Sequence, residues 1–156
     1  MGTWTVAEDD PRRSDITTLL ERHLDFAREV TPPDDVHALE LDGLLDDGVT
    51  FFSLRDDHGR LLGIGAIKQL DETHVELKSI HTAAEARGNG VGAAMVAHLV
   101  EVARRRRATR VSLETGSMEE FAPSRALYRR AGFIECEPFA GYSPSRNSTF
   151  MTLELR

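Results

Sequence analysis

The chain has 156 residues, of which 40% are hydrophobic and 29% are charged, a composition that is ordinary for a globular protein. This length suits a single domain with one hydrophobic core, which we expect to cover residues 1–156. The net charge of −7 and the isoelectric point near 5.3 disfavour nucleic acid as a partner, because binding to its phosphates requires a basic surface.

Cysteine use and the apolar runs bear on the compartment. Cys136 is the single cysteine, which excludes an internal disulfide and fits a reducing environment. No apolar run is long enough to span a membrane, and the first ten residues lack the basic and apolar regions of a signal peptide. We therefore expect a cytoplasmic protein with no membrane partner, and Cys136 in the core rather than as a nucleophile.

The spacing of apolar residues and the turn signals predict the secondary structure. In chain order we expect a strand at residues 3–7, helices at 15–29 and 34–45, strands at 49–55, 61–70 and 75–82, a helix from about 91 to 107, a strand at 109–115, a helix at 123–131, and strands at 133–136 and 150–155. This order predicts an α/β fold with a mixed sheet of about seven strands, flanked by about four helices.

Three places in this series carry specific expectations. Ser14 is suited to cap the first helix. Gly63 and Gly65 weaken their strand, so we expect a bulge there or the close approach of another segment. The four arginines at 104–107 fall at a helix C-terminus, where positive charge offsets the helix dipole. The alternative is that one of them reaches a ligand phosphate.

A glycine loop connects the strand at residues 75–82 to the helix from about residue 91, with glycines at positions 88, 90 and 92. The first turn of a helix has unpaired N–H donors and partial positive charge, and glycine lets a bulky anion come close. The loop therefore predicts a phosphate site. It lacks the lysine of a P-loop and the G-x-G-x-x-G spacing of a dinucleotide site.

The loop resembles the acyl-CoA pyrophosphate loop R/Q-x-x-G-x-G/A of the GNAT N-acetyltransferases, with Arg87, Gly90 and Gly92 at the fixed positions. The segment SRALYRRAGF at residues 124–133 is similar to the family's A-x-x-L-Y-x-K-x-G-F motif and includes Tyr128. The order of elements resembles GNAT over nearly the whole chain. The resemblance implies the GNAT fold and an acetyl-CoA-dependent N-acetyltransferase.

The resemblance also implies where the acetyl-CoA cosubstrate would bind. The loop N–H groups would hold the pyrophosphate, and the backbone N–H of Ile80 would face the acetyl oxygen at a bulge that the sequence does not reveal. The implied cosubstrate-binding residues are Ser79, Ile80, His81, Thr82, Arg87, Gly88, Asn89, Gly90, Val91, Gly92 and Tyr128.

The same resemblance implies two catalytic residues. Tyr128 would give its phenolic proton to the departing thiolate, although it could also serve only to pack its helix. Glu76 would be the base for the acceptor amine, or else a structural or positioning group. Lys78 lies two residues on and on the same strand face, and an ion pair would lower the basicity of this carboxylate. His81 and His74 are the next candidates for the base.

Acceptor selection in the family comes from the first two helices and from the loop before the last strand. That implies substrate-binding residues Phe26, Phe139 and Tyr142, with His23, Glu40, Asp42 and Arg146 nearby. An acidic lining would suit a cationic amine. The six histidines have no metal-ligand spacing, so we expect no metal.

Three functions remain open at this stage. The first is acetylation of the primary amine of a small-molecule or amino-acid-like acceptor by direct attack. The second is acetylation of a protein or peptide terminus, and the third is acyl-CoA sensing without turnover. The oligomeric state is also open, with a homodimer as one option.

Overall fold

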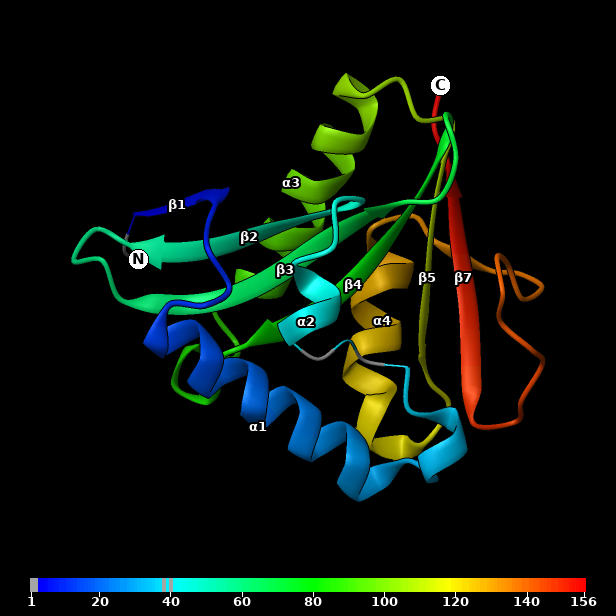
Figure 1. Cartoon of the computed structure of the whole chain (residues 1–156), viewed down its shortest axis with the longest axis horizontal. Coiled ribbons are helices and arrows are strands. Elements are labelled where there is room, and N and C mark those ends of the chain that lie inside the picture. Colours follow the sequence, from blue (N-terminus) through cyan, green and yellow to red (C-terminus); the bar gives the residue numbers. More distant parts are fainter. Residues whose placement is uncertain (1–2, 38, 40) are drawn as a thin grey trace.

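The computed structural model describes residues 3–37, 39 and 41–156 (Figure 1). In this part of the chain, seven strands form one sheet in the order β1-β2-β3-β4-β5-β7-β6. The strands are β1 (Trp4–Glu8), β2 (Val49–Asp56), β3 (Leu61–Gln69), β4 (His74–Thr82), β5 (Arg110–Gly116), β6 (Ile134–Glu135) and β7 (Ser148–Glu154).

Four helices accompany the sheet in the described residues: α1 (Ser14–Val30), α2 (Leu41–Leu44), α3 (Val91–Arg105) and α4 (Ala122–Arg130). Figure 1 shows α1 in front of the sheet and α3 behind β2 and β3. Both faces of the central strands are therefore covered, which explains why Gly63 to Ile67 of β3 are buried without alternation. The predicted mixed α/β fold with about seven strands and four helices is confirmed. No helix in the described part of the chain is both long and apolar enough to cross a membrane.

The strand pairing is antiparallel throughout, except between β4 and β5. These two strands run parallel and pair only from His74 to Glu76, opposite Arg110 to Ser112. Both strands continue beyond this point without pairing to each other, β4 to Thr82 and β5 to Gly116. The sheet therefore opens between its two central strands.

Helix α3 packs very closely on β3 at the two glycines of that strand. A Cβ atom at Gly63 would lie 2.8 Å from the Val91 side chain, and one at Gly65 would lie 2.9 Å from Met95. Only glycine fits at this separation. Of the two alternatives, the close approach of another segment is confirmed. The pairing is also irregular opposite Gly65, but there the extra residue belongs to β4 and not to β3.

The expected helix at residues 34–45 is wrong. Among the described residues of this stretch, which exclude 38 and 40, the chain forms a single 3₁₀ turn at Pro33–Asp35, leaves it in extended conformation at Val36, and is helical again in the four residues of α2. Packing explains the difference, because the His37 ring contacts Tyr142 at 4.9 Å between ring centroids, and an extended backbone lets Val36 and His37 line a cavity.

The expected N-cap of the first helix, Ser14, does not have that role. Arg13 occupies that position and makes no side-chain capping bond, while Ser14 is the first helical residue. A turn from Asp10 to Arg13, closed by a 3.1 Å backbone hydrogen bond, starts the helix one residue earlier.

The arginine run lies at the helix end where we expect it, whereas Cys136 differs from its expected place. Arg106, just after α3, binds Thr50 Oγ1 at 2.8 Å, and the arginine run lies at the opposite end of this 15-residue helix from the glycine loop. At 1.5 Å per residue the two ends are about 22 Å apart, so the run stays at the dipole's negative end and away from that loop. Cys136 is half-buried rather than in the core, since its neighbour Ile134 lies on the edge strand and is 67% exposed.

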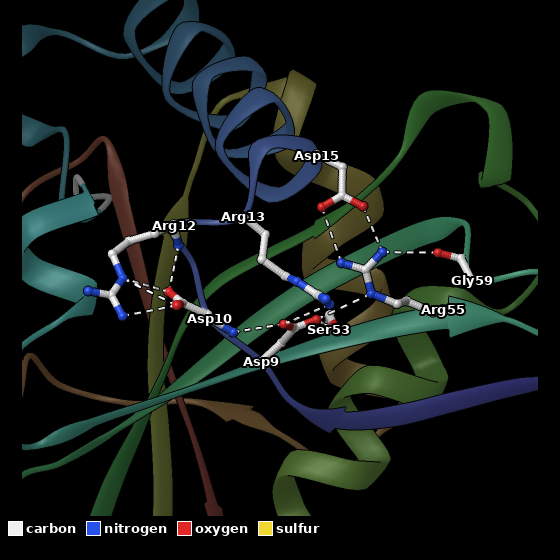
Figure 2. Close-up of polar contacts among 8 residues, drawn as sticks. All are labelled: Asp9, Asp10, Arg12, Arg13, Asp15, Ser53, Arg55 and Gly59. Carbon is white, nitrogen blue, oxygen red and sulfur yellow. Dashed lines mark hydrogen bonds and ion pairs between the residues drawn. The ribbon is translucent and has the colours of Figure 1, made fainter.

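A polar cluster fastens the start of α1 to β2 (Figure 2). Arg55 of β2 donates to Asp15 of α1 at 2.6 Å and to Asp9 at 3.2 Å. Ser53, the neighbour of Arg55 on the same strand face, donates to Asp9 at 2.5 Å. Desolvation would raise the pKa of Asp9, but the hydrogen bonds from Ser53 and Arg55 outweigh it and keep that pKa below its usual value. Asp9 thus needs both partners to stay buried as an anion.

Arg55→Ala should destabilise the protein by about 1–3 kcal/mol, because it leaves the carboxylate of Asp9 buried without its cation. Urea unfolding followed by circular dichroism measures the loss. Arg12→Ala is the matched control: Arg12 also binds an aspartate, Asp10, but both side chains are largely exposed, at 67% and 45%. Little change is expected there. Equal midpoints for the two variants would contradict a structural role for the Arg55 cluster.

Candidate active site

Two neighbouring cavities share a wall beside the open end of β4. The smaller has a volume of about 120 Å³ and lies between β4, β5, α1 and the turn at Pro33–Asp35. The larger, of about 530 Å³, follows the glycine loop and the start of α3 to α4. The residues that line both are Phe26, Ile80, His81, Ser124 and Tyr128.

A β-bulge in β4 lies at the junction of the two cavities. Lys78 pairs with Ala66 and His81 with Ile64, so Ser79 and Ile80 together face Gly65. Ser79 has a φ of +57°, a left-handed conformation that is rare for a residue other than glycine. A bulge disrupts the regular ladder of strand hydrogen bonds and re-aims the local backbone. It occurs at Ile80, the residue expected to face the acetyl oxygen.

The glycine loop lies at the wall of the larger cavity. Gly90 caps α3 with a φ of +83°, and a Cβ atom placed on it would meet nothing within 4 Å. The loop and the first turn of α3 therefore border open space, with the positive end of the helix dipole beside it. Asn89 donates from its side chain to the carbonyl of Ala86 at 3.2 Å, which holds the loop in shape.

Most of the residues expected at the cosubstrate come together around the larger cavity: Ile80, His81, Thr82, Arg87, Gly88, Gly90, Val91, Gly92 and Tyr128. Ser79 lines the smaller cavity instead, and its hydroxyl is buried without a hydrogen-bond partner among the described residues. Asn89 lines neither cavity. Arg130 joins the wall of the larger cavity, which gives that wall two guanidinium groups with Arg87.

Tyr128 of α4 stands between the cavities. It is buried, with 7% of its surface exposed, and its ring packs edge-on against Phe133. Burial raises the pKa of its phenol, and the nearby Glu114 carboxylate adds to that effect. The hydroxyl therefore keeps its proton at neutral pH and can act as a donor.

Glu76 is held by two donors and lies almost out of contact with solvent. Its Oε2 accepts from Tyr142 Oη at 2.5 Å and from Lys78 Nζ at 3.1 Å, and the side chain is 3% exposed. Lys78 also donates to Tyr142 at 2.8 Å, so the three groups form a closed triangle. The ion pair between Glu76 and Lys78 that the strand spacing predicted is present.

The residues expected to bind the acceptor are not all at the cavities. Phe26 lines both and packs on Phe121 at 5.2 Å between ring centroids. Tyr142 and Phe139 line neither cavity. Tyr142 donates a hydrogen bond to Glu76, and the ring of Phe139 packs edge-on against that of Tyr142, with 5.2 Å between ring centroids. Of the further acceptor candidates, His23 lines the smaller cavity, Asp42 and Arg146 line neither, and Glu40 lies outside the described residues.

Comparison with known proteins agrees with this geometry. The family model of the GNAT acetyltransferases matches residues 15–133. The uncharacterized N-acetyltransferase YsnE of Bacillus subtilis is 42% identical over 147 residues, 94% of this chain and 97% of that protein. The chain belongs to the GNAT family. It is an acetyl-CoA-dependent N-acetyltransferase.

Solved structures share the fold of this GNAT enzyme. A Klebsiella pneumoniae protein assigned as an acyl-CoA N-acyltransferase superposes with a TM-score of 0.80 and 28% identity, over 99% of each chain. A Bacillus subtilis acetyltransferase in complex with CoA superposes with a TM-score of 0.75 and 16% identity, over 99% of this chain and 100% of that one. The second likeness concerns the fold alone.

Glu114 lines the smaller cavity, and sequence reasoning missed it. It extends from β5 into the smaller cavity, two residues beyond Ser112, which pairs with Glu76. Burial raises the pKa of Glu114 to about 7, although Ser148 and Lys78 act in the opposite direction. The Ser148 hydroxyl lies close enough to lower the pKa of Glu114, but it has no hydrogen-bond partner within the usual distance and angle limits among the described residues. A charged residue inside a β-favouring strand was the available signal.

Two of the three histidines at the smaller cavity, His23 and His81, form a direct pair. His23 Nδ1 of α1 and His81 Nδ1 of β4 are 3.1 Å apart, so one ring donates and the other accepts. Burial lowers the pKa of His23 to about 4, and burial with the charges of His23 and two arginines lowers that of His81 to about 3. Both rings are neutral at pH 7, and His81 is therefore a weak proton acceptor there. His74, the other candidate, bonds Ser112 at 2.7 Å and lines neither cavity.

Metal-ligating side chains do not gather in this site. Within residues 3–37, 39 and 41–156, no group of three or more His, Cys, Asp or Glu side chains could hold a metal ion.

The histidine pair should make stability depend on pH. In the unfolded chain both rings take up protons below about pH 6.5, whereas the folded protein resists protonation until far lower pH, so the stability contributed by the two rings is lost as pH falls. Glu114, whose pKa is raised to about 7, acts in the opposite direction over this range, so the histidine effect is measured as the difference between wild type and the His23 variant. Near pH 5.5 the loss should be about 1 kcal/mol for each histidine. Chemical unfolding from pH 7.5 to 5 would show it. His23→Gln should flatten the dependence, and His58→Gln, at a ring 80% exposed, should not. A parallel pH dependence in wild type and His23→Gln would contradict this account.

Proposed function

We propose that the enzyme acetylates the primary amine of a small-molecule or amino-acid-like acceptor by direct attack on acetyl-CoA. The observation that carries the proposal is that the two cavities share Ile80, His81 and Tyr128 in their walls. One cavity is lined by the glycine loop and two arginines, which would bind the pyrophosphate and phosphate of acetyl-CoA. The other is lined by carboxylates that suit an amine. The thioester would then lie at the junction.

The charge of the smaller cavity supports an amine acceptor. Its wall includes the carboxylates of Asp35, Glu76 and Glu114 against the single ammonium of Lys78. Asn147 donates to Asp35 at 3.0 Å and keeps the pKa of that carboxyl low, so it stays negative. A cationic ammonium group would be attracted into this field.

The size of the smaller cavity favours a small acceptor group. Its 120 Å³ is below the roughly 300–1,000 Å³ of pockets that enclose a drug-sized ligand. The volume suits an amine with a short side chain, or the amino end of a longer molecule. We infer that the cavity receives only the reacting end of the acceptor.

Each residue would have a defined part in the transfer. The loop N–H groups, with Arg87 and Arg130, would hold the pyrophosphate and phosphate of acetyl-CoA. The backbone at the Ser79–Ile80 bulge would polarise the thioester carbonyl. Tyr128 would protonate the leaving thiolate.

Gly90→Glu should abolish binding of CoA by isothermal titration calorimetry, because the new side chain enters the open space at the loop and adds a like charge. The control is Gly59→Glu. Gly59 lies in an exposed hairpin with a φ of +78° and open space at its Cβ, so it carries the same backbone strain and the same charge far from the site. Unchanged CoA affinity in Gly90→Glu, or an equal loss of affinity in both variants, would contradict the assignment of the loop as the pyrophosphate site.

Tyr128→Phe should lower kcat by about 10²–10⁴-fold while CoA affinity stays nearly constant, because the ring still packs and only the proton donor is lost. Released thiol measures turnover, and calorimetry measures affinity. The exposed variant His58→Gln, away from both cavities, should keep the wild-type rate. Normal turnover in Tyr128→Phe would show that the tyrosine only packs α4 and that the thiolate leaves unaided.

A further inference from the structure

We propose that Glu114 of β5 is the catalytic base that takes the proton from the acceptor's ammonium, and that Glu76 of β4 positions the cavity wall. This inference rests on the proposed function, since it concerns the acceptor amine. It assigns different roles to two carboxylates that line the same cavity. Glu76 as base stays a competing prediction, and the experiment below decides between them.

The contacts of Glu76 suit an anchor. Its Oε2 accepts from both Lys78 and Tyr142, at 3.1 Å and 2.5 Å. Taking up a proton at Oε2 would break the bond from Tyr142 and remove the attraction for Lys78, a cation whose side chain is only 8% exposed. A buried ammonium without its counter-charge is costly. The same bond ties the loop that carries Tyr142 to β4. Glu76 therefore serves the site best by remaining charged.

The place of Glu114 suits a base. The parallel register that sets Glu76 beside Ser112 brings Glu114, two residues on, to the level of Lys78, beyond the last paired residue. At this point the strands have separated, and Glu114 lines the cavity together with Tyr128. A proton acceptor on β5 and a proton donor on α4 thus border one small space. The acceptor nitrogen and the thioester sulfur would have to meet in that space.

The electrostatic setting of Glu114 agrees with its place. Burial dominates and raises its pKa to about 7, Glu76 and Asp35 add to the rise, and Lys78 and Ser148 reduce it. Tyr128 and Tyr142 are the other titratable groups that feel its charge, and both keep their protons at neutral pH. The remaining titratable groups at the cavity are the neutral histidines His23 and His81, and His37, whose pKa is lowered by burial and by Lys78. A base poised near neutrality both accepts and releases a proton readily.

The reaction balances with these two groups. Glu114 takes one proton from the ammonium, and the freed nitrogen lone pair forms the C–N bond at the thioester carbonyl. As the tetrahedral intermediate collapses, the C–S bond breaks and its electron pair stays on sulfur, which takes the proton of Tyr128. The nitrogen loses its second proton, which restores Tyr128. Glu114 then releases its proton to solvent.

The test compares Glu114→Gln with wild type on two small probe amines, n-propylamine and 2,2,2-trifluoroethylamine, from pH 5.5 to 9.5. Propylamine is a cation over this range, whereas trifluoroethylamine is already deprotonated at neutral pH. With propylamine, wild-type kcat/KM should rise to a plateau with a midpoint near pH 7. Glu114→Gln should lose this midpoint, rise continuously with pH, and be about 10²–10⁴-fold slower at neutral pH. With trifluoroethylamine the variant should keep nearly the wild-type rate.

Glu76→Gln is the matched control, an identical substitution in the same cavity. It should keep the midpoint near pH 7 with propylamine and instead raise KM for the amine or lower the unfolding midpoint, because Lys78 loses its counter-charge. A direct measurement accompanies the kinetics: the carboxyl ¹³C resonances of the free protein should include a group that titrates near pH 7. That titration should vanish in Glu114→Gln and persist in Glu76→Gln.

The possible outcomes distinguish a failure of the proposed function from a failure of the role assigned to Glu114. If wild type turns over neither probe although it binds CoA, the proposed small-amine function fails, and the role of Glu114 fails with it. If wild type is active and Glu114→Gln keeps both the midpoint and the rate, Glu114 is not the base while the function stands. If Glu76→Gln is the variant that loses the midpoint, Glu76 is the base and the proposal is overturned.

Discussion

The separation of β4 from β5 is the constraint on which the rest of the structure depends. Parallel pairing between these strands stops after Glu76 and Ser112, although both strands continue. Strands that stop pairing in the middle of a sheet lose ladder hydrogen bonds and leave polar backbone groups to be satisfied by other partners. Here the bulge at Ser79 and Ile80 and the close packing of α3 on Gly63 and Gly65 hold β4 on the side of β3. The gap that results is the site.

Charge in this gap is arranged so that neighbouring groups behave differently. Glu76 accepts hydrogen bonds from Lys78 and Tyr142. Glu114 is partly desolvated and forms no ion pair with a cation among the described residues. Environments that differ in this way separate the acid–base behaviour of two identical side chains. The histidine pair adds neutral donors and acceptors to the same wall, since burial keeps both rings uncharged at pH 7.

The walls of the smaller cavity are fixed by contacts between segments far apart in the chain. Tyr142 reaches Glu76, Asn147 reaches Asp35, and His23 reaches His81. Each contact joins a helix, turn or loop to the opening of the sheet or to the opposite wall. The fold is shared with other acetyltransferases of known structure, so it does not identify the acceptor, which has to be inferred from the residues of these walls.

The sequence by itself determined the series of strands and helices, the glycine loop at the start of α3 and the place of Tyr128, because each is a local pattern of apolar spacing, glycine or motif. It also predicted the ion pair of Glu76 and Lys78, which follows from the two-residue period of a strand. The single turn at residues 33–35, the bulge, the histidine pair and the half-buried Glu114 were decided only by the tertiary structure. The partners of these residues lie up to 112 positions away, and burial, which sets their protonation, is a property of the packed chain alone.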